Sequence, residues 1–320
     1  MPTRKFFPPR WEDFLKALMD RLSKTTPSLF SVRCLTESTL SHVFEEVRIS
    51  LSLPSTYPSG TKILDLLMSM GLATRIPIEG TPTSRPSKKF FLFGIRGSQK
   101  INVDPLELLQ AYHQSGVICY FSALSYLNMT SQPATYHHIA ILTPPKKKVK
   151  TDPAEILPKT IRPMEKIVRS RLGTPIFSYQ GIPYYSTRRI LNSIPGIKTR
   201  SLSPWIKIRM TTTEQTLLDT LQYPFHCGGP EAIFEAWERK INKIDDELIL
   251  DYLKEIQIAP LTRRLGAIFD LYDHQPTNKL GSFLKYSIKR VMTGSEFKTI
   301  SLLRGIDYSR INSTWDVSVP

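Results

Sequence analysis

The sequence contains few of the features on which secreted, membrane-spanning and metal-binding proteins commonly depend. Its 320 residues include only three cysteines, Cys34, Cys119 and Cys227, which lie far apart and form no C-x-x-C pair. This spacing argues against a disulfide framework or a cysteine-rich zinc site and is typical of a protein in a reducing cytosol. No apolar run approaches the ~20 residues that span a bilayer. The first residues also lack the apolar core of a secretory signal, and we expect a cytoplasmic protein.

Motifs that carry strong catalytic signals are also missing. The sequence has no Walker A loop, no G-x-G-x-x-G fingerprint, no G-x-S-x-G elbow and no H-E-x-x-H helix. The adjacent His137 and His138 would point to opposite faces of a strand and so are unsuited to one shared metal ion. We therefore predict no catalytic residue, no metal site and no cofactor, and we do not expect an enzyme.

Negative charge is scarce in the first two-thirds of the chain. The whole sequence carries 43 Lys and Arg against 28 Asp and Glu, a net charge of +15. Residues 1–100 contribute a net of +7 and residues 101–210 a net of +10, whereas residues 211–320 have a net of −2. This asymmetry favours a polyanion, such as a nucleic acid, as the partner of the first two-thirds.

Three amphipathic segments followed by two strands are expected in the first hundred residues. Apolar residues recur at helical spacing in residues 11–22, 35–47 and 59–71. Residues 72–78 and 89–94 have the composition of strands, and the stretch between them is rich in turn residues. Three helices followed by a hairpin are the order of a winged helix-turn-helix domain.

We predict that this N-terminal domain, residues 1–97, binds double-stranded DNA. In a winged helix the third helix enters the major groove and the hairpin contacts phosphates. An interaction module for proteins is the alternative, because the third helix has few of the Arg, Asn and Gln residues that best recognise base edges. The residues predicted to contact DNA are Ser59, Thr61 and Lys62 at the start of the third helix, with Arg75, Arg85, Lys88 and Lys89 on the wing.

Residues 98–320 are predicted to form a second domain of mixed sheet and helices that becomes helical from about residue 211. We expect a helix over 117–127 and strands over 135–143, 171–186 and 203–210. A proline-flanked basic loop lies among them, and it is a further candidate for contact with a polyanion. Its lysines are Lys146, Lys147, Lys148 and Lys150.

The stretch TTTEQTLLDTLQYPFHCGGPE, residues 211–231, holds several residue types that carry chemistry. Thr211 and Glu214 have the spacing of a capping box, and Asp219 is expected to bond to a backbone turn or a basic side chain. Cys227 is expected to be a small buried apolar residue, and Pro230 to begin the next helix. A metal-dependent nuclease built on Glu214, Asp219 and His226 is the least favoured interpretation.

Several of these stretches together resemble one family. They are ICYFSALSYLNMTSQ, followed by TYHHIAI, then KIRMTTTEQTLLDTLQYPFHCGGPEAIFEAW, and finally LTRRLGAIFDLY. In order and spacing, over roughly residues 101–275, they are similar to the AbiEi-like antitoxins, the transcriptional regulators of type IV toxin–antitoxin and abortive-infection systems. The N-terminal segment is longer than the compact wing of that family.

The resemblance implies a bacterial cytoplasmic protein encoded beside a nucleotidyltransferase-like toxin. Its N-terminal winged helix would bind inverted repeats in its own promoter and repress transcription. Its second domain would act as the antitoxin in phage defence, and type IV antitoxins are thought to oppose their toxins without a stable complex. The alternative from another class is a protein that binds the toxin directly, through residues 211–320.

Overall fold

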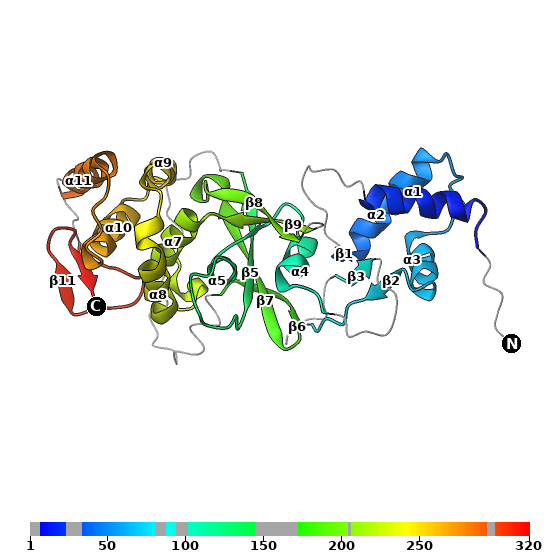
Figure 1. Cartoon of the computed structure of the whole chain (residues 1–320), viewed down its shortest axis with the longest axis horizontal. Coiled ribbons are helices and arrows are strands. Elements are labelled where there is room, and N and C mark those ends of the chain that lie inside the picture. Colours follow the sequence, from blue (N-terminus) through cyan, green and yellow to red (C-terminus); the bar gives the residue numbers. More distant parts are fainter. Residues whose placement is uncertain are drawn as a thin grey trace. The chain divides into compact units, whose positions relative to one another are not determined.

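The computed structural model of the chain describes residues 7–23, 34–80, 88–93, 102–144, 172–203, 206–292 and 298–320. The described chain has a mixed α/β fold, as the sequence predicts (Figure 1). It divides into two compact units. The first comprises Met1–Gln114, Ile176–Pro183 and Thr199–Ile208, and the second comprises Ser115–Pro175, Tyr184–Lys198 and Arg209–Pro320.

The first unit combines helices with a small antiparallel sheet. Its sheet has the order β1-β3-β2, with Cys34 opposite Leu92 and Ala73 opposite Phe93. The three helices and two strands expected from the sequence are present, and the short strand β1 was not predicted. The elements are α1 (Trp11–Ser23), β1 (Cys34–Thr36), α2 (Glu37–Ser50), α3 (Gly60–Ser69), β2 (Ala73–Arg75), β3 (Phe90–Phe93) and α4 (Pro105–Tyr112).

Aromatic and aliphatic side chains from all three N-terminal helices form one core. Phe14 of α1 lies 5.3 Å from the ring of Tyr57 and 6.3 Å from that of Phe44, between ring centroids. Leu40 and Leu67 are fully buried in the same cluster. Because such burial contributes about 2 kcal/mol per large side chain, the apolar stripes of α1, α2 and α3 orient their polar faces outward.

The helix α4 belongs to the first unit. The buried carboxylate of Glu107 accepts a hydrogen bond of 2.6 Å from the backbone N–H of Cys34 in β1. The ring of Tyr112, at the end of α4, lies 5.9 Å from that of Phe177 in a tilted arrangement, and Phe177 in turn contacts Phe90 of β3. The boundary expected at residue 97 lies outside the described residues, and the first compact unit includes the chain as far as Gln114 together with two later segments.

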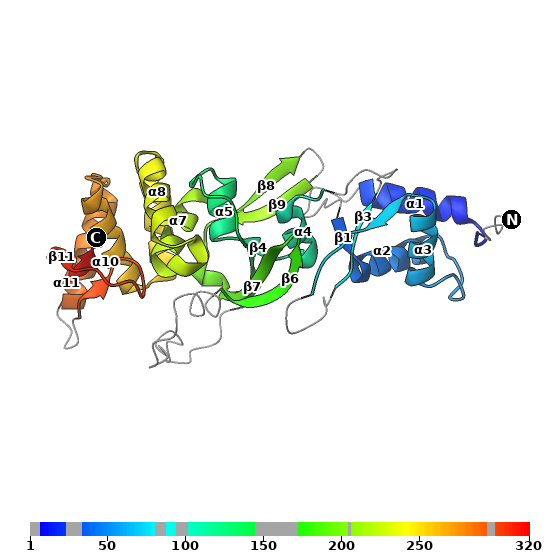
Figure 2. The same cartoon turned by 90° about the horizontal axis from the view of Figure 1, so that it is seen from below.

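Six strands form the larger sheet, in the order β6-β7-β5-β4-β9-β8. Figure 2 labels β4, β6, β7, β8 and β9 of this sheet. The pairing of β5 with β7 is parallel, from His137 opposite Tyr184 to Thr143 opposite Ile190. The pairing of β4 with β5 is antiparallel. The strands are β4 (Val117–Ile118), β5 (His137–Thr143), β6 (Thr174–Tyr179), β7 (Ile182–Ile190), β8 (Ile197–Ser203) and β9 (Ile206–Thr211).

The helix expected over 117–127 is wrong at its beginning. Val117 and Ile118 form the strand β4, and only α5 (Phe121–Tyr126) is helical. Both β-branched residues pair with the buried strand β5, which is remote in sequence. Tyr120 then adopts φ +57°, a left-handed conformation that separates the strand from the helix.

Helices dominate the end of the second unit, as expected. The helix α7 (Thr213–Gln222) contacts α8 (Pro230–Lys240), α9 (Asp246–Ile256) and α10 (Ala259–Leu271). The helix α11 (Asn278–Met292) packs against α9 and α10. Short 3-10 turns lie at Leu191–Ser193, Pro224–Cys227 and Ile241–Lys243, and a small sheet follows with β10 (Ile300–Ser301), β11 (Arg310–Asn312) and β12 (Val317–Val319).

The Arg-Leu-Gly segment of α10 attaches this small sheet to the helices. The Arg263 side chain donates hydrogen bonds to the carbonyl oxygens of Trp315 and Lys298, at 2.9 and 3.1 Å. Gly266 faces the Trp315 ring so closely that a Cβ atom there would overlap it. The helical backbone of Gly266 could be adopted by any residue. Glycine is therefore required here by the close contact with the Trp315 ring and not by the backbone conformation.

We predict that Gly266→Ala destabilises the protein. The added methyl group must displace the Trp315 ring, and such overpacking costs about 1–3 kcal/mol, more than the ~1 kcal/mol gained in helix propensity. Urea unfolding measures the change. Gly281→Ala in α11 is the control, because the nearest atom to its added Cβ is Pro276 Cγ at an ordinary 3.6 Å. Equal effects of the two substitutions would contradict the packing argument.

Candidate nucleic-acid interface

The outer face of α3 carries short polar and charged side chains. Ser59, Thr61 and Lys62 are exposed at its beginning, while Ile63, Leu64 and Leu67 are buried. Asp65 and Ser69 continue the exposed face. The apolar side of α3 thus turns all three residues predicted at the start of this helix toward solvent.

The beginning of α3 lies close to α2. A Cβ atom on Gly60 would lie 2.7 Å from Ser41 Oγ of α2, so only glycine allows this approach without displacement. Ser59 is the N-cap residue by its backbone angles, but its side chain makes no capping hydrogen bond. The first backbone N–H groups of α3 therefore depend on other acceptors.

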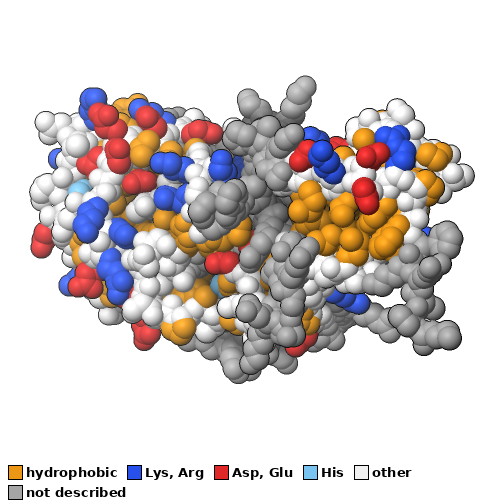
Figure 3. Space-filling view, turned by 45° about the vertical axis from the view of Figure 1, so that its right-hand side comes forward, with side chains coloured by type: hydrophobic (Ala, Val, Ile, Leu, Met, Phe, Trp, Pro, Cys, Tyr) orange, Lys and Arg blue, Asp and Glu red, His pale blue; other side chains and the backbone are white. Residues whose placement is uncertain are grey.

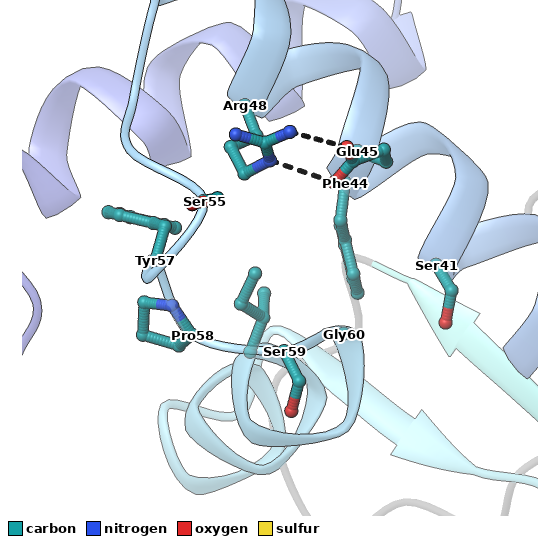
Figure 4. Close-up of a pocket in the computed structure, with 10 residues that line it drawn as sticks. Ser41, Phe44, Glu45, Arg48, Ser55, Tyr57, Pro58, Ser59 and Gly60 are labelled. Atoms are coloured by element: carbon teal, nitrogen blue, oxygen red, sulfur yellow. Dashed lines mark hydrogen bonds and ion pairs between the residues drawn. The ribbon is translucent and has the colours of Figure 1, made fainter.

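A pocket opens between α2 and the segment that leads into α3 (Figure 4). Its charged groups are internally satisfied. Arg48 donates hydrogen bonds of 2.6 and 2.8 Å to the Glu45 carboxylate and one of 2.9 Å to the Leu53 carbonyl oxygen. The pocket is lined by Ser41, Phe44, Glu45, Arg48, Ser55, Tyr57, Pro58, Ser59, Gly60 and Ile63.

The predicted wing residues differ in solvent exposure and in whether their charged groups bond to other residues of the protein. Arg75 is exposed at the end of β2. The Lys89 ammonium lies 3.2 Å from the Glu37 carboxylate, with both side chains partly accessible to water. The half-buried Lys88 donates to the Tyr112 carbonyl oxygen at 2.5 Å and lies 4.4 Å from the centre of the Tyr112 ring. Burial lowers the pKa of Lys88.

Five further predicted contacts cannot be placed. Arg85 and the basic-loop residues Lys146, Lys147, Lys148 and Lys150 lie outside the described residues. On the face shown in Figure 3, the described Lys and Arg side chains are interspersed with Asp and Glu. Of the predicted DNA-contacting residues, Ser59, Thr61 and Lys62 lie together at the beginning of α3. Lys88 is directed toward Tyr112.

The chemistry-bearing stretch of α7 is used internally. Asp219 forms an ion pair of 2.6 Å with Arg189 of β7, with side chains only 2% and 3% exposed. Gln215 donates a second hydrogen bond of 2.9 Å to the Asp219 carboxylate. Burial raises the pKa of Asp219, and the Arg189 charge acts against that shift. Of the two partners expected for Asp219, a backbone turn or a basic side chain, the structure shows the basic side chain.

Arg189 in turn lies among aromatic rings. Its guanidinium carbon is 5.5 Å from the centre of the Tyr120 ring and 5.2 Å from that of Tyr223. The His226 ring contacts Tyr120 at 4.8 Å and His138 at 5.2 Å, between centroids. Burial lowers the pKa of His138 to about 3 and that of His226 to about 4, so both rings are neutral near pH 7. No sequence spacing predicted this cluster.

The expected capping box at Thr211 and Glu214 is wrong by one residue. Thr212 is the N-cap of α7, and its hydroxyl oxygen accepts a hydrogen bond from the Gln215 N–H at 3.2 Å. Thr211 is the last residue of β9, where its hydroxyl bonds that of Thr216. Because β9 continues through Thr211, the N-cap of α7 is Thr212, one residue later than expected.

The expectations for Cys227 and Pro230 hold. Cys227 is fully buried, and burial raises the pKa of its thiol. Gly228 and Gly229 both have positive φ angles, and Pro230 begins α8. His137 and His138 are buried on β5 and contact different neighbours. Within the described residues, no three His, Cys, Asp or Glu side chains are grouped so as to hold a metal ion.

Comparison with known proteins leaves the family open. No protein-family model matches the chain, and no curated protein matches it. A solved structure that is similar is that of the RV2827C protein from Mycobacterium tuberculosis, with 13% sequence identity and a TM-score of 0.49. That similarity covers 98% of this chain and 92% of the other. Among the described residues, no helix is long and apolar enough to cross a membrane.

We predict that removing one partner of the Arg189–Asp219 pair lowers the free energy of unfolding by about 3–5 kcal/mol, because a buried charge is left unpaired. Asp219→Leu and Arg189→Met are each measured by urea unfolding. The double variant is expected to be destabilised by less than the sum of the two single changes.

The exposed pair Lys254–Asp251, whose side chains are 55% and 69% exposed, is the matched control. Asp251→Leu is expected to cost less than about 1 kcal/mol. Additive costs in the double variant of the buried pair would show that the two charges do not depend on each other.

Proposed function

We propose that the chain is a cytoplasmic DNA-binding transcriptional repressor and the antitoxin of a type IV toxin–antitoxin system. Its first unit would bind inverted repeats in double-stranded promoter DNA. Its second unit would oppose a nucleotidyltransferase-like toxin, as part of phage defence. The observation that carries the DNA-binding proposal is the exposed polar face of α3, followed in the chain by the strands β2 and β3.

The element order of the first unit supports a winged helix-turn-helix. The helices α2 and α3 are adjacent in sequence and in contact, and β3 pairs with both β1 and β2. In a winged helix the helix in the position of α3 enters the major groove, and the connection between the strands in the positions of β2 and β3 lies along the phosphates. Ser59, Thr61 and Lys62 are exposed on the side of α3 that this orientation requires.

The charge of the chain supports the same partner. Residues 1–100 carry 15 Lys and Arg against 8 Asp and Glu, and a basic surface attracts the phosphate backbone at any sequence. The antitoxin part of the proposal depends on the motif resemblance. The structure gives those motifs a packing role, as in the Asp219 pair and the contact of Gly266 with Trp315.

We predict that Arg75→Ala weakens binding of the full chain to all duplexes, since an exposed arginine on the wing contacts phosphate rather than bases. The slope of the logarithm of the DNA-binding constant against the logarithm of the salt concentration should become less negative by about one, because one phosphate contact fewer releases about one counterion fewer. Gel-shift titrations of the duplex upstream of its own reading frame, and of a mixed-sequence duplex, measure both quantities.

Two variants separate a wing contact from a general charge effect. Lys88→Ala is expected to change binding less, because its ammonium is bonded to Tyr112. Lys254→Ala removes one exposed lysine from α9 in the second unit and is expected to leave the salt slope unchanged. An unaltered slope in Arg75→Ala would remove this residue from the interface, and the absence of any duplex binding would refute the proposed function.

A second candidate function is a protein-binding antitoxin that captures the toxin directly. Exposed apolar side chains on the helices of the second unit favour it, since Leu248 of α9 is 39% exposed and Tyr286 of α11 is 68% exposed. Residues 211–320 also have nearly balanced charge, with 13 Lys and Arg against 15 Asp and Glu. A repressor-type antitoxin is expected to separate from the toxin in size-exclusion chromatography at micromolar concentration. Co-elution of the two proteins would favour direct capture instead.

A further inference from the structure

The exposed face of α3 carries an acid where a DNA-binding surface usually excludes one. Asp65 is exposed on the same side of the helix as Lys62, three residues earlier. No hydrogen bond or ion pair joins either side chain to another described residue, although this spacing allows one. Both charged groups are therefore available to a ligand that approaches α3.

A carboxylate on such a surface has a defined electrostatic consequence. It is repelled by the phosphates and so weakens contact with DNA of any sequence. The repulsion is offset when the carboxylate accepts a hydrogen bond from an amino group on a base edge. In the major groove, Asp accepts from cytosine N4, whereas Lys donates to guanine O6 and N7.

The spacing of the two residues suits neighbouring base pairs. Three residues advance an α-helix by about 4.5 Å, and successive base pairs are about 3.4 Å apart. The other side of α3 is fixed by the burial of Ile63, Leu64 and Leu67. If α3 rotated so that Lys62 and Asp65 left the outer surface, the apolar side chains of Ile63, Leu64 and Leu67 would become exposed.

We propose that Lys62 and Asp65 determine the sequence specificity of this protein by recognising two adjacent G·C base pairs, Lys62 at guanine and Asp65 at cytosine. This inference rests on the proposed function, in which α3 enters the major groove. Asp65 has two effects in it, since the same carboxylate selects cytosine at one position and disfavours DNA that lacks cytosine there.

The experiment is a selection of binding sites from a randomised duplex pool with the full chain and its variants. The unsubstituted chain is expected to enrich sites with guanine and cytosine at adjacent positions. Asp65→Ala should lose about tenfold of the preference for cytosine at one position, while its binding to mixed-sequence duplex becomes tighter. Lys62→Ala should lose the preference for guanine at the neighbouring position only.

Asp65→Asn makes the sharpest distinction, because it keeps the side-chain shape and removes the charge. Asparagine pairs best with adenine N6 and N7, so the selected base at that position should change from cytosine to adenine. Glu12→Ala, on the exposed side of α1, is the matched control for loss of one negative charge in the same unit. It should leave the selected sequence unchanged.

The outcomes separate this inference from the proposed function. A chain that enriches DNA sites but shows the same base preferences in all three α3 variants overturns the roles of Lys62 and Asp65 and leaves DNA binding intact. A shift that Glu12→Ala reproduces also overturns them, because the effect then comes from net charge. A chain that enriches no duplex refutes the proposed function and this inference together.

Discussion

In the second unit a guanidinium and a carboxylate meet 2.6 Å apart where water scarcely reaches either group. Arg189 belongs to the strand β7 of the large sheet, and Asp219 belongs to the helix α7, so the ion pair joins the two elements. Because neither charge is solvated, each is stable only while the other remains in place. The rings of Tyr120 and Tyr223 lie against the Arg189 guanidinium, so aromatic packing in this region depends on the same contact.

This constraint also accounts for two of the chemically reactive residues in the stretch from Thr211 to Glu231. Asp219 has its carboxylate occupied by Arg189 and Gln215, and the buried Cys227 thiol has its pKa raised. A catalytic carboxylate or thiol needs access to a substrate and a suitable pKa. Asp219 lies in α7, and Cys227 directly precedes the Gly228–Gly229 turn that leads to α8.

The beginning of α3 in the first unit has the opposite character, because its polar residues are exposed to solvent. Apolar burial on one side of α3 orients Ser59, Thr61 and Lys62 outward without any ion pair to hold them. Such a surface is suited to bind a second molecule. In the function that we propose, the first unit contacts DNA through α3 and the following strands. The second unit, whose polar residues form buried contacts such as the Arg189–Asp219 pair, acts as the antitoxin.

The sequence by itself determined the α/β class, the amphipathic helices and the outward face of α3, since each follows from local periodicity. For Asp219 it left open a backbone turn or a basic side chain and did not indicate Arg189, because that pairing joins residues distant in sequence. Only the tertiary structure decided that Val117 and Ile118 form a strand, that Thr212 caps α7, and that the Lys88 charge is directed to Tyr112. These outcomes depend on pairing, burial and hydrogen bonds between remote segments, which local propensity does not contain.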